Sequence, residues 1–186
     1  MKRGILGTFL VAAVLVATAM AADKGNPKAP LTGADLEKGV RHGILMYPKY
    51  TLWDDISFRI DNGNVELFGA VSQPYKKSDI EHIVQRIPGV ASVTNEIKVL
   101  PLSRQDDQLR LQVARAIFRD PMLSRYSMGA VPSIHIIVDN GHVTLTGAVN
   151  NTVDKQVAGM RASGAGLSFG PVINNLTVDN PPAKKS

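Results

Sequence analysis

The sequence predicts an α+β protein of two tandem modules, each with the element order α-β-β-α-β. The first observation is an internal repeat, because DNGNVELFGAV at residues 61–71 matches DNGHVTLTGAV at residues 139–149 at most positions. The second is the alternation of apolar and polar residues around Asn-Gly in each copy, which indicates a β-hairpin. The third is a helical spacing of apolar residues before and after each hairpin. We therefore expect two helices on one face of a small three-stranded mixed sheet in each module.

An amphipathic helix opens each module. Its apolar face in the first copy consists of Leu36, Val40, Ile44 and Tyr47. The corresponding face in the second copy consists of Leu109, Val113, Ala116 and Ile117. A proline, Pro48 or Pro121, ends each helix. Asp35 and either Asp106 or Asp107 are the predicted N-caps, because a carboxylate there accepts free backbone N–H groups.

A tight hairpin follows each of these helices. The apolar positions of its two strands in the first copy are Ile56, Phe58, Ile60, Val65, Leu67 and Val71. The turns are Asn62-Gly63 and Asn140-Gly141, and this pair suits a two-residue type I′ turn, in which both residues need φ > 0. The second strand of each hairpin contains a glycine, Gly69 or Gly147. A strand glycine marks a bulge or a close approach of another backbone segment.

A second helix and a final strand complete each module. In the first copy the buried face of this helix is predicted to be Ile80, Ile83, Val84 and Ile87. In the second copy the weaker equivalents are Val153, Val157 and Met160. Glycines at 159, 164 and 166 lower the helix propensity by ~1 kcal/mol each, so a short or frayed helix is expected there. The final strands are expected at 93–99 and 172–178.

The first 22 residues are predicted to be a cleaved signal peptide. Lys2 and Arg3 precede an uncharged run from Ile5 to Ala19, and Ala19-Met20-Ala21 has the small-x-small pattern of a cleavage site. A retained membrane anchor is the alternative, but the run is shorter than the ~20 residues of a spanning helix. The expected organisation after it is a flexible leader at 23–31, modules at 32–100 and 107–178 with a linker at 101–106, and a disordered tail at 179–186.

Composition excludes several classes of function. The chain has no cysteine, which excludes disulfides, thiolate nucleophiles, zinc sites built on cysteine and lipid attachment through an N-terminal cysteine. The formal charge of +5 becomes 5 − 2 = +3 without Lys2 and Arg3, and this weak excess does not indicate a nucleic-acid partner. The four histidines lack metal-ligand spacing, and no nucleophile–base pattern or nucleotide fingerprint occurs. We expect no enzyme activity, cofactor or metal.

The repeated pattern resembles the BON domain, the family named for bacterial osmotic-shock and nodulation proteins. In the second copy the resemblance rests on Asp120-Pro121, on NGHVTLTG at 140–147 and on Asn174. In the first copy it rests on NGNVELFG at 62–69 and on Asn95, with Tyr47-Pro48 in place of Asp-Pro. The resemblance covers nearly all of the mature chain as two tandem copies. The second copy departs from the pattern in its glycine-rich second helix and in a long insert, residues 122–133.

The resemblance implies an exported periplasmic protein without chemistry of its own. BON domains are regarded as binding phospholipid surfaces or envelope partners, and they are linked to osmotic stress, envelope stress and outer-membrane integrity. These properties come from the resemblance and not from composition.

One helix carries a feature that the fold alone does not require. The first helix of the second copy has a second apolar stripe, away from its core-facing side, and arginines lie beside it. The candidate contact residues on this helix are Arg110, Leu111, Arg115, Phe118 and Arg119, and Met122 extends the stripe. Trp53, before the first strand of the first copy, is a separate candidate contact residue. Arginine beside large apolar groups suits an anionic lipid surface. The alternatives are that the stripe packs against the first copy or binds a protein, and that Trp53 is a partly buried core residue rather than an interfacial anchor.

Two main functions follow from these observations. The first is peripheral association with anionic phospholipid through this helix. The second is a protein-binding role, as an envelope chaperone or assembly partner, supported by half-polar sheets whose free edges could accept a strand. A small-ligand or polysaccharide binder would need an aromatic-lined concave site, which 5% aromatic residues disfavours. The sequence leaves the oligomeric state open.

Overall fold

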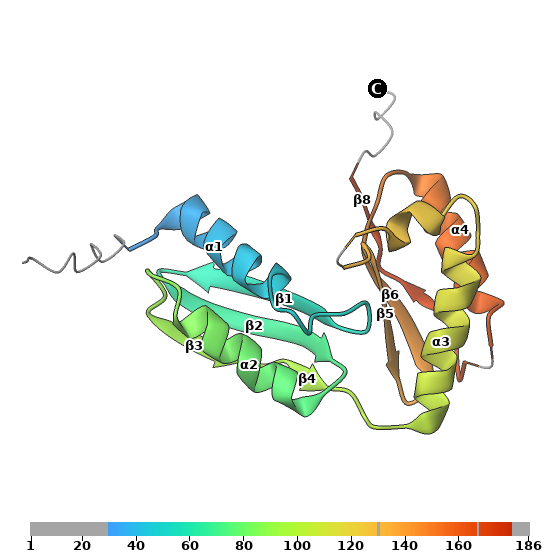
Figure 1. The fold of residues 1–186 in the computed structure, drawn as a ribbon, viewed down its shortest axis with the longest axis horizontal. Helices are drawn as coiled ribbons and strands as arrows, with labels where there is room; N and C mark the ends of the chain where they lie inside the picture. Colours follow the sequence, from blue (N-terminus) through green and yellow to red (C-terminus); the bar gives the residue numbers. More distant parts are fainter. Residues whose placement is uncertain (1–29, 130, 167, 180–186) are drawn as a thin grey trace, which may run out of the picture.

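The structure is a computed structural model that describes residues 30–129, 131–166 and 168–179. The predicted signal peptide, the leader up to residue 29 and the tail from residue 180 lie outside the described residues. The chain forms two α+β modules that lie side by side, which confirms the predicted fold class (Figure 1).

The first module has the expected element order. Its elements are α1 (Gly33–Leu45), β1 (Asp55–Asp61), β2 (Asn64–Val71), α2 (Pro74–Gln85), β3 (Ser92–Asn95) and β4 (Lys98–Val99). Strand β1 pairs antiparallel with β2, and both β3 and β4 pair parallel with β2. The predicted final strand is therefore divided in two. Asn95 lies at the break, where its side chain donates to the Lys77 carbonyl at 2.9 Å and accepts from the Ile97 amide at 3.2 Å.

The second module repeats this topology with one addition. Its elements are α3 (Arg104–Phe118), the 3₁₀ helix η1 (Ser124–Ser127), β5 (Ile134–Asp139), β6 (His142–Val149), α4 (Thr152–Ser163), β7 (Ile173–Asn174) and β8 (Thr177–Val178). Asn174 divides its last strand as Asn95 does, with bonds to the Lys155 carbonyl and the Leu176 amide. Because α3 begins at Arg104, residues 104–106 of the expected linker are helical.

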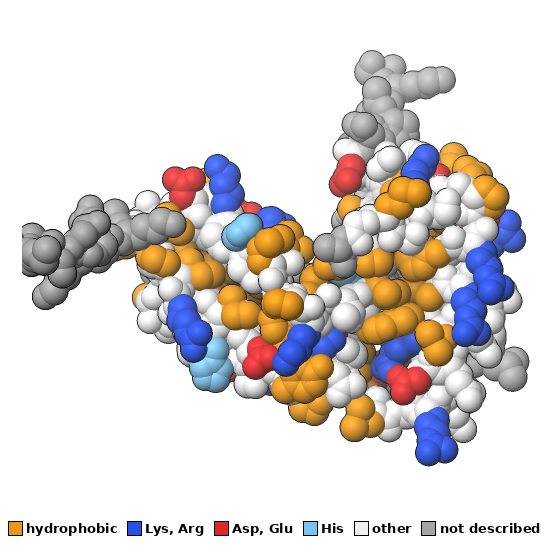
Figure 2. All heavy atoms as spheres, in the orientation of Figure 1, with side chains coloured by type: hydrophobic (Ala, Val, Ile, Leu, Met, Phe, Trp, Pro, Cys, Tyr) orange, Lys and Arg blue, Asp and Glu red, His pale blue; other side chains and the backbone are white. Residues whose placement is uncertain are grey.

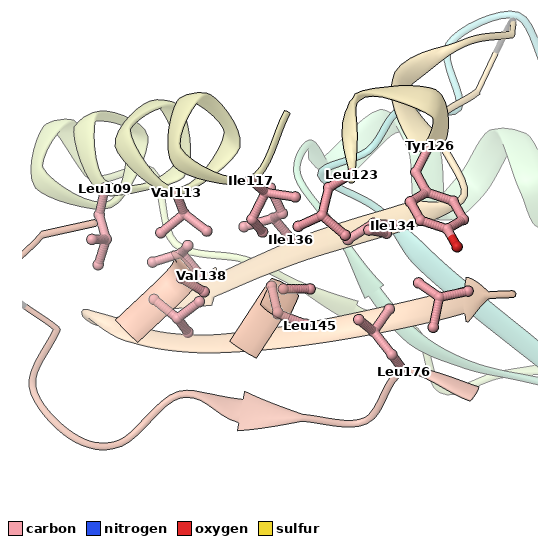
Figure 3. Packing of buried hydrophobic residues seen from close by; sticks show 14 residues of the cluster. Leu109, Val113, Ile117, Leu123, Tyr126, Ile134, Ile136, Val138, Leu145 and Leu176 are labelled. Atoms are coloured by element: carbon pink, nitrogen blue, oxygen red, sulfur yellow. The ribbon is translucent and has the colours of Figure 1, made fainter. Parts of the chain in front are cut away.

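Each module has its own hydrophobic core between its helices and one face of its sheet. In the second module, the side chains of α3 point toward those of β5 and β6 (Figure 3). The residues of this core that Figure 3 labels are Leu109, Val113, Ile117, Leu123, Tyr126, Ile134, Ile136, Val138, Leu145 and Leu176. Leu123 and Tyr126 come from the insert, so this segment completes the second core rather than looping into solvent.

The hairpin predictions are confirmed. Asn62 and Gly63 have φ of 48° and 82°, and Asn140 and Gly141 have φ of 50° and 77°, as a type I′ turn requires. The strand glycines mark close backbone approaches. A Cβ on Gly69 would lie 2.2 Å from the Asp55 carbonyl oxygen.

The predicted helix N-caps are wrong. Thr32 is the N-cap of α1 and makes no side-chain cap bond, while Ser103 caps α3 by accepting from the Asp106 amide at 3.2 Å. Asp106 instead turns its carboxylate to the next hairpin, where it accepts from the backbone amides of Asn140 and Gly141. The Asp106 carboxylate therefore binds distant backbone amides instead of capping its own helix.

The prediction of a short second helix in the second module is also wrong. Helix α4 has 12 residues, as many as α2. Its buried positions are Asp154, Ala158 and Ala162, whereas Val153 and Met160 are exposed. Small residues line the core side because the strand end approaches closely, and a Cβ on Gly159 would lie 2.7 Å from the Asn174 side-chain nitrogen.

A buried charge occupies the same helix position in both modules with opposite sign. Lys76 of α2 pairs with Asp54 at 2.6 Å, and both side chains are buried. Asp154 of α4, 78 residues later, which is also the offset between the two hairpins, pairs with Arg125 of η1 and accepts from the Tyr126 hydroxyl. In each case the partner comes from the segment before the first strand, so an ion pair joins that segment to the second helix.

The two modules contact each other through the segments before their first strands. The Ile136 amide of β5 donates to the Leu52 carbonyl at 2.8 Å, and Leu52 and Trp53 pack against the second core. In the other direction Val131 packs against the first core. Lys98 also pairs with Asp139. Strand β5 is consequently buried on both faces.

The burial of His135 is a consequence of this contact between the modules. The alternation of apolar and polar residues in its strand predicts an outward, solvated position for this histidine, and that prediction is wrong. The structure buries His135 against Tyr50, with ring centroids 5.4 Å apart. Burial lowers the pKa of His135 below its usual value, although the nearby Asp55 opposes this effect.

We expect acid to weaken the fold through His135. Below the unfolded pKa of about 6.5 the unfolded chain binds the proton more readily, so stability falls as the pH drops toward the lower folded pKa. Urea midpoints between about pH 7.5 and about pH 5 should show this slope in the natural protein and a smaller one in His135→Phe, which keeps an aromatic ring but does not titrate. Equal slopes in the two proteins would assign the acid sensitivity to other groups.

Candidate membrane-contact face on α3

Helix α3 presents three different sides. Its core side consists of Leu109, Val113 and Ile117, which are buried. The predicted apolar stripe lies on another side and is only partly covered: Leu111 is 47% exposed and Met122, just beyond the helix, is 46% exposed. These two side chains are therefore available at the surface of the second module.

The basic residues near this stripe differ in exposure. Arg115 and Arg119 are exposed, whereas Arg110 is buried. Figure 2 shows basic side chains along the α3 edge of the second module, beside a hydrophobic area that faces the first module. Because an exposed guanidinium beside apolar side chains can meet a phosphate while the apolar groups enter the headgroup region, this surface has the chemistry of a membrane-contact helix.

Arg110 does not belong to this surface. It is 5% exposed, and its guanidinium donates to the Val138 carbonyl at 2.7 Å and pairs with Asp107. The predicted contact role of Arg110 is therefore corrected to a structural one, in which it fastens α3 to the edge of β5. Periodicity could not reveal this role, because the partner is a backbone carbonyl 28 residues away.

Phe118 and Trp53 are partly buried, and both pack against the core of the second module. Trp53 reaches this core from the first module and lines a cavity of about 230 Å³ together with Leu102, Arg110 and Leu111. The structure thus brings Trp53 next to α3, as a residue of the contact between the modules.

A groove at the C-terminal end of α3 adds residues that the sequence pattern missed. It has a volume of about 390 Å³ and lies between α3 and α4. Arg119 and Arg161 both line it, and the Arg161 Nε donates to Asp120 at 2.7 Å. This bond holds the pKa of Asp120 below its usual value, so the carboxylate stays charged and keeps Arg161 in place. Met160, which is 65% exposed, stands at the same groove.

The described part of the chain contains no cluster of three or more His, Asp or Glu side chains arranged to hold a metal ion. None of the helices in residues 30–129, 131–166 and 168–179 is long and apolar enough to cross a membrane.

Comparison with known proteins identifies the modules. The model of the BON domain matches the chain twice, over residues 36–101 and 105–180. No curated protein matches the sequence. The chain is similar to a solved structure described as "CdsD - The structural protein of the Type III secretion system of Chlamydia trachomatis: C-terminal domain", with 15% identity and a TM-score of 0.28, over 80% of this chain and 99% of that chain. A second CdsD structure is 17% identical with a TM-score of 0.27, over 80% and 94% of the two chains.

Proposed function

Because this chain belongs to the BON domain family, a family of binding rather than catalytic domains, we propose that it is a non-enzymatic periplasmic protein that associates peripherally with anionic phospholipid. The proposal includes export by cleavage of the 1–22 signal peptide and a role in osmotic or envelope stress. The observation that carries the lipid part is the exposed surface of α3, where Arg115 and Arg119 stand beside Leu111 and Met122.

The arrangement on α3 suits a headgroup better than a buried acyl chain. Two guanidiniums, Arg119 and Arg161, border one groove, so a phosphate there would meet donors from two helices. Met122 and Met160 are flexible, exposed apolar side chains that can enter the headgroup region without a fixed partner shape. The proposed mode is therefore binding to the surface of a bilayer, with α3 lying along it.

The proposal is tested by co-sedimentation of the chain from residue 23 onward with phosphatidylglycerol and phosphatidylcholine vesicles. We expect binding to the anionic vesicles that weakens as salt rises. Arg115→Ala/Arg119→Ala should weaken it roughly 30-fold, because each basic residue near an anionic surface contributes about 1 kcal/mol and 1.4 kcal/mol is tenfold. Leu111→Ser should weaken binding at high salt as well, since its contribution is apolar.

A matched control removes the same charge elsewhere. Arg59→Ala/Arg86→Ala also takes away two exposed arginines, but from the first module. This variant should retain nearly all vesicle binding. An equal loss of binding in both double variants would mean that net charge, and not the α3 surface, causes the effect. Binding that does not depend on salt, or no binding to either kind of vesicle, would contradict the lipid proposal and favour a protein-binding envelope role.

A further inference from the structure

The two hairpin turns have the same Asn-Gly pair and nearly the same backbone. Asn62 and Asn140 are both exposed, and their φ angles are 48° and 50°. The glycine carbonyl of each turn accepts one backbone amide from the segment after the second helix of its module, at 2.8 and 3.0 Å. A difference in the chemistry of the two turns must therefore come from their other contacts.

The turn of the second module is held by a buried carboxylate. Asp106, which is 3% exposed, accepts from the backbone amides of Asn140 and Gly141 at 3.0 and 2.9 Å. The ring of Phe169 lies on the same turn, because a Cβ on Gly141 would be 2.4 Å from the Phe169 Cδ2 atom. The amide nitrogen of Gly141 is thus both hydrogen-bonded and covered.

The turn of the first module lacks this carboxylate. The residue aligned with Asp106, 73 positions earlier, is Gly33, which has no side chain. Among the described residues, the side-chain hydrogen bonds at this turn run from Asn62 to Asp61 and from Ser92 to Asn64, and neither involves the amide of the turn glycine. That glycine is half-buried, and its neighbour is the methyl group of an alanine rather than an aromatic ring.

An asparagine followed by glycine can lose its side-chain amide without an enzyme. Water takes the proton of the glycine N–H, and the nitrogen forms a bond to the asparagine Cγ while the side-chain nitrogen leaves as ammonia. A second water molecule then opens one of the two C–N bonds of the resulting succinimide ring, which yields aspartate or isoaspartate. Glycine favours this reaction because it has no Cβ to hinder the approach of its nitrogen.

Opening of the turn controls how fast the ring can form. The succinimide ring requires a different ψ at the asparagine from the one that a type I′ turn imposes, so the reaction proceeds from an opened turn. In the second module, opening must break two hydrogen bonds to a buried carboxylate, and hydrogen bonds to ionised acceptors are the stronger kind. The first turn opens without that cost.

We propose that Asn62 is a site of spontaneous deamidation and that Asp106 protects Asn140 from the same reaction. The product in the first module carries a new carboxylate at an exposed turn, and its isoaspartate form also adds a methylene group to the backbone there. The second module, which carries the α3 surface, keeps its turn intact. This inference does not depend on lipid binding.

The test is incubation of the chain from residue 23 onward at mildly alkaline pH, followed by proteolysis and tandem mass spectrometry. We expect Asn62 to be converted roughly tenfold or more faster than Asn140, because a hydrogen bond to a charged group is strong enough to lower the open population by that factor. In urea-unfolded chain the two residues should react at similar rates, since glycine follows both.

A variant and a second measurement isolate the role of the carboxylate. Asp106→Asn keeps the size of the side chain but removes its charge and one acceptor, and it should raise the rate at Asn140 toward the rate at Asn62. Glu96→Gln removes an exposed carboxylate at the other end of β3 and should change neither rate. Circular dichroism confirms that both variants are folded. Hydrogen exchange in the natural chain should be slower at the Gly141 amide than at the Gly63 amide.

Four results would overturn the proposal. One is an equal rate at the two residues in the folded chain. Another is faster reaction at Asn140, which would mean that the Asp106 carboxylate promotes the reaction by accepting the amide proton. A difference that persists in urea would assign the effect to local sequence. An unchanged rate at Asn140 in folded Asp106→Asn would show that the carboxylate gives no protection.

Discussion

Replacing Asp54 with alanine is expected to lower the free energy of unfolding of the first module by about 3–5 kcal/mol. Asp54 is fully buried and accepts from Lys76, from the Thr51 amide and from the Ser72 amide at 2.6, 2.9 and 2.8 Å. Its removal leaves the ammonium group of Lys76 buried without its counter-charge. It also frees two backbone amides that lie at either end of the β1–β2 hairpin.

Urea unfolding followed by circular dichroism and by the fluorescence of Trp53 measures this change. Trp53 is the only tryptophan and is adjacent to Asp54, so its emission reports on the same segment. Glu37→Ala is the control, because it breaks an exposed ion pair with Arg41 and should cost less than 1 kcal/mol. Asp54→Ala/Lys76→Met should recover part of the loss. A cost of less than 1 kcal/mol for Asp54→Ala would contradict the buried-pair account.

The same carboxylate makes the first module sensitive to strong acid. Burial by itself would raise the pKa of Asp54, but the hydrogen bonds from Lys76, Ser72 and Thr51 outweigh it and lower the pKa below its usual value. A carboxyl with a lowered folded pKa contributes its full stability above the unfolded pKa of about 3.9 and loses it as the pH falls through the folded value. The effect of Asp54→Ala should therefore be complete at neutral pH.

Gly147→Ala is expected to destabilise the second module by about 3 kcal/mol. Gly147 has φ of 99°, a conformation that costs a residue with a side chain of order 1–3 kcal/mol. A Cβ would also lie 2.1 Å from the Ser133 carbonyl oxygen, so the backbone before β5 would have to move. Strand β5 is the strand that contacts the first module, and the change should therefore loosen that contact as well.

Gly164→Ala is the matched control for this substitution. Gly164 follows α4 with φ of −90°, and its nearest neighbour for a Cβ, the Met160 carbonyl oxygen, is 3.6 Å away. Alanine fits there, and it should leave stability unchanged or raise it by less than about 1 kcal/mol. Thermal unfolding of both variants, with hydrogen exchange at Ile136, separates the two cases. Similar midpoints for Gly147→Ala and the natural chain would show that the close approach at Ser133 is not rigid.

The local features of this protein follow from its sequence because neighbouring residues decide them. Asn62-Gly63 and Asn140-Gly141 require left-handed backbone whatever surrounds them, and the alternation on either side determines which face of each strand is buried. The repeat, the BON family and the α+β fold could all be read from these short segments. The sequence predicted the lengths and buried faces of the helices less well, since in α4 the close approach of Asn174 selects Gly159 and the small residues beside it.

Only the tertiary structure decided which charged and polar side chains are free. Arg110, Arg115 and Arg119 belong to one helix, but Arg110 alone reaches the backbone of β5 and is buried. The physical reason is that spacing along a helix determines the direction of a side chain, whereas burial depends on whether a partner from a distant segment lies in that direction.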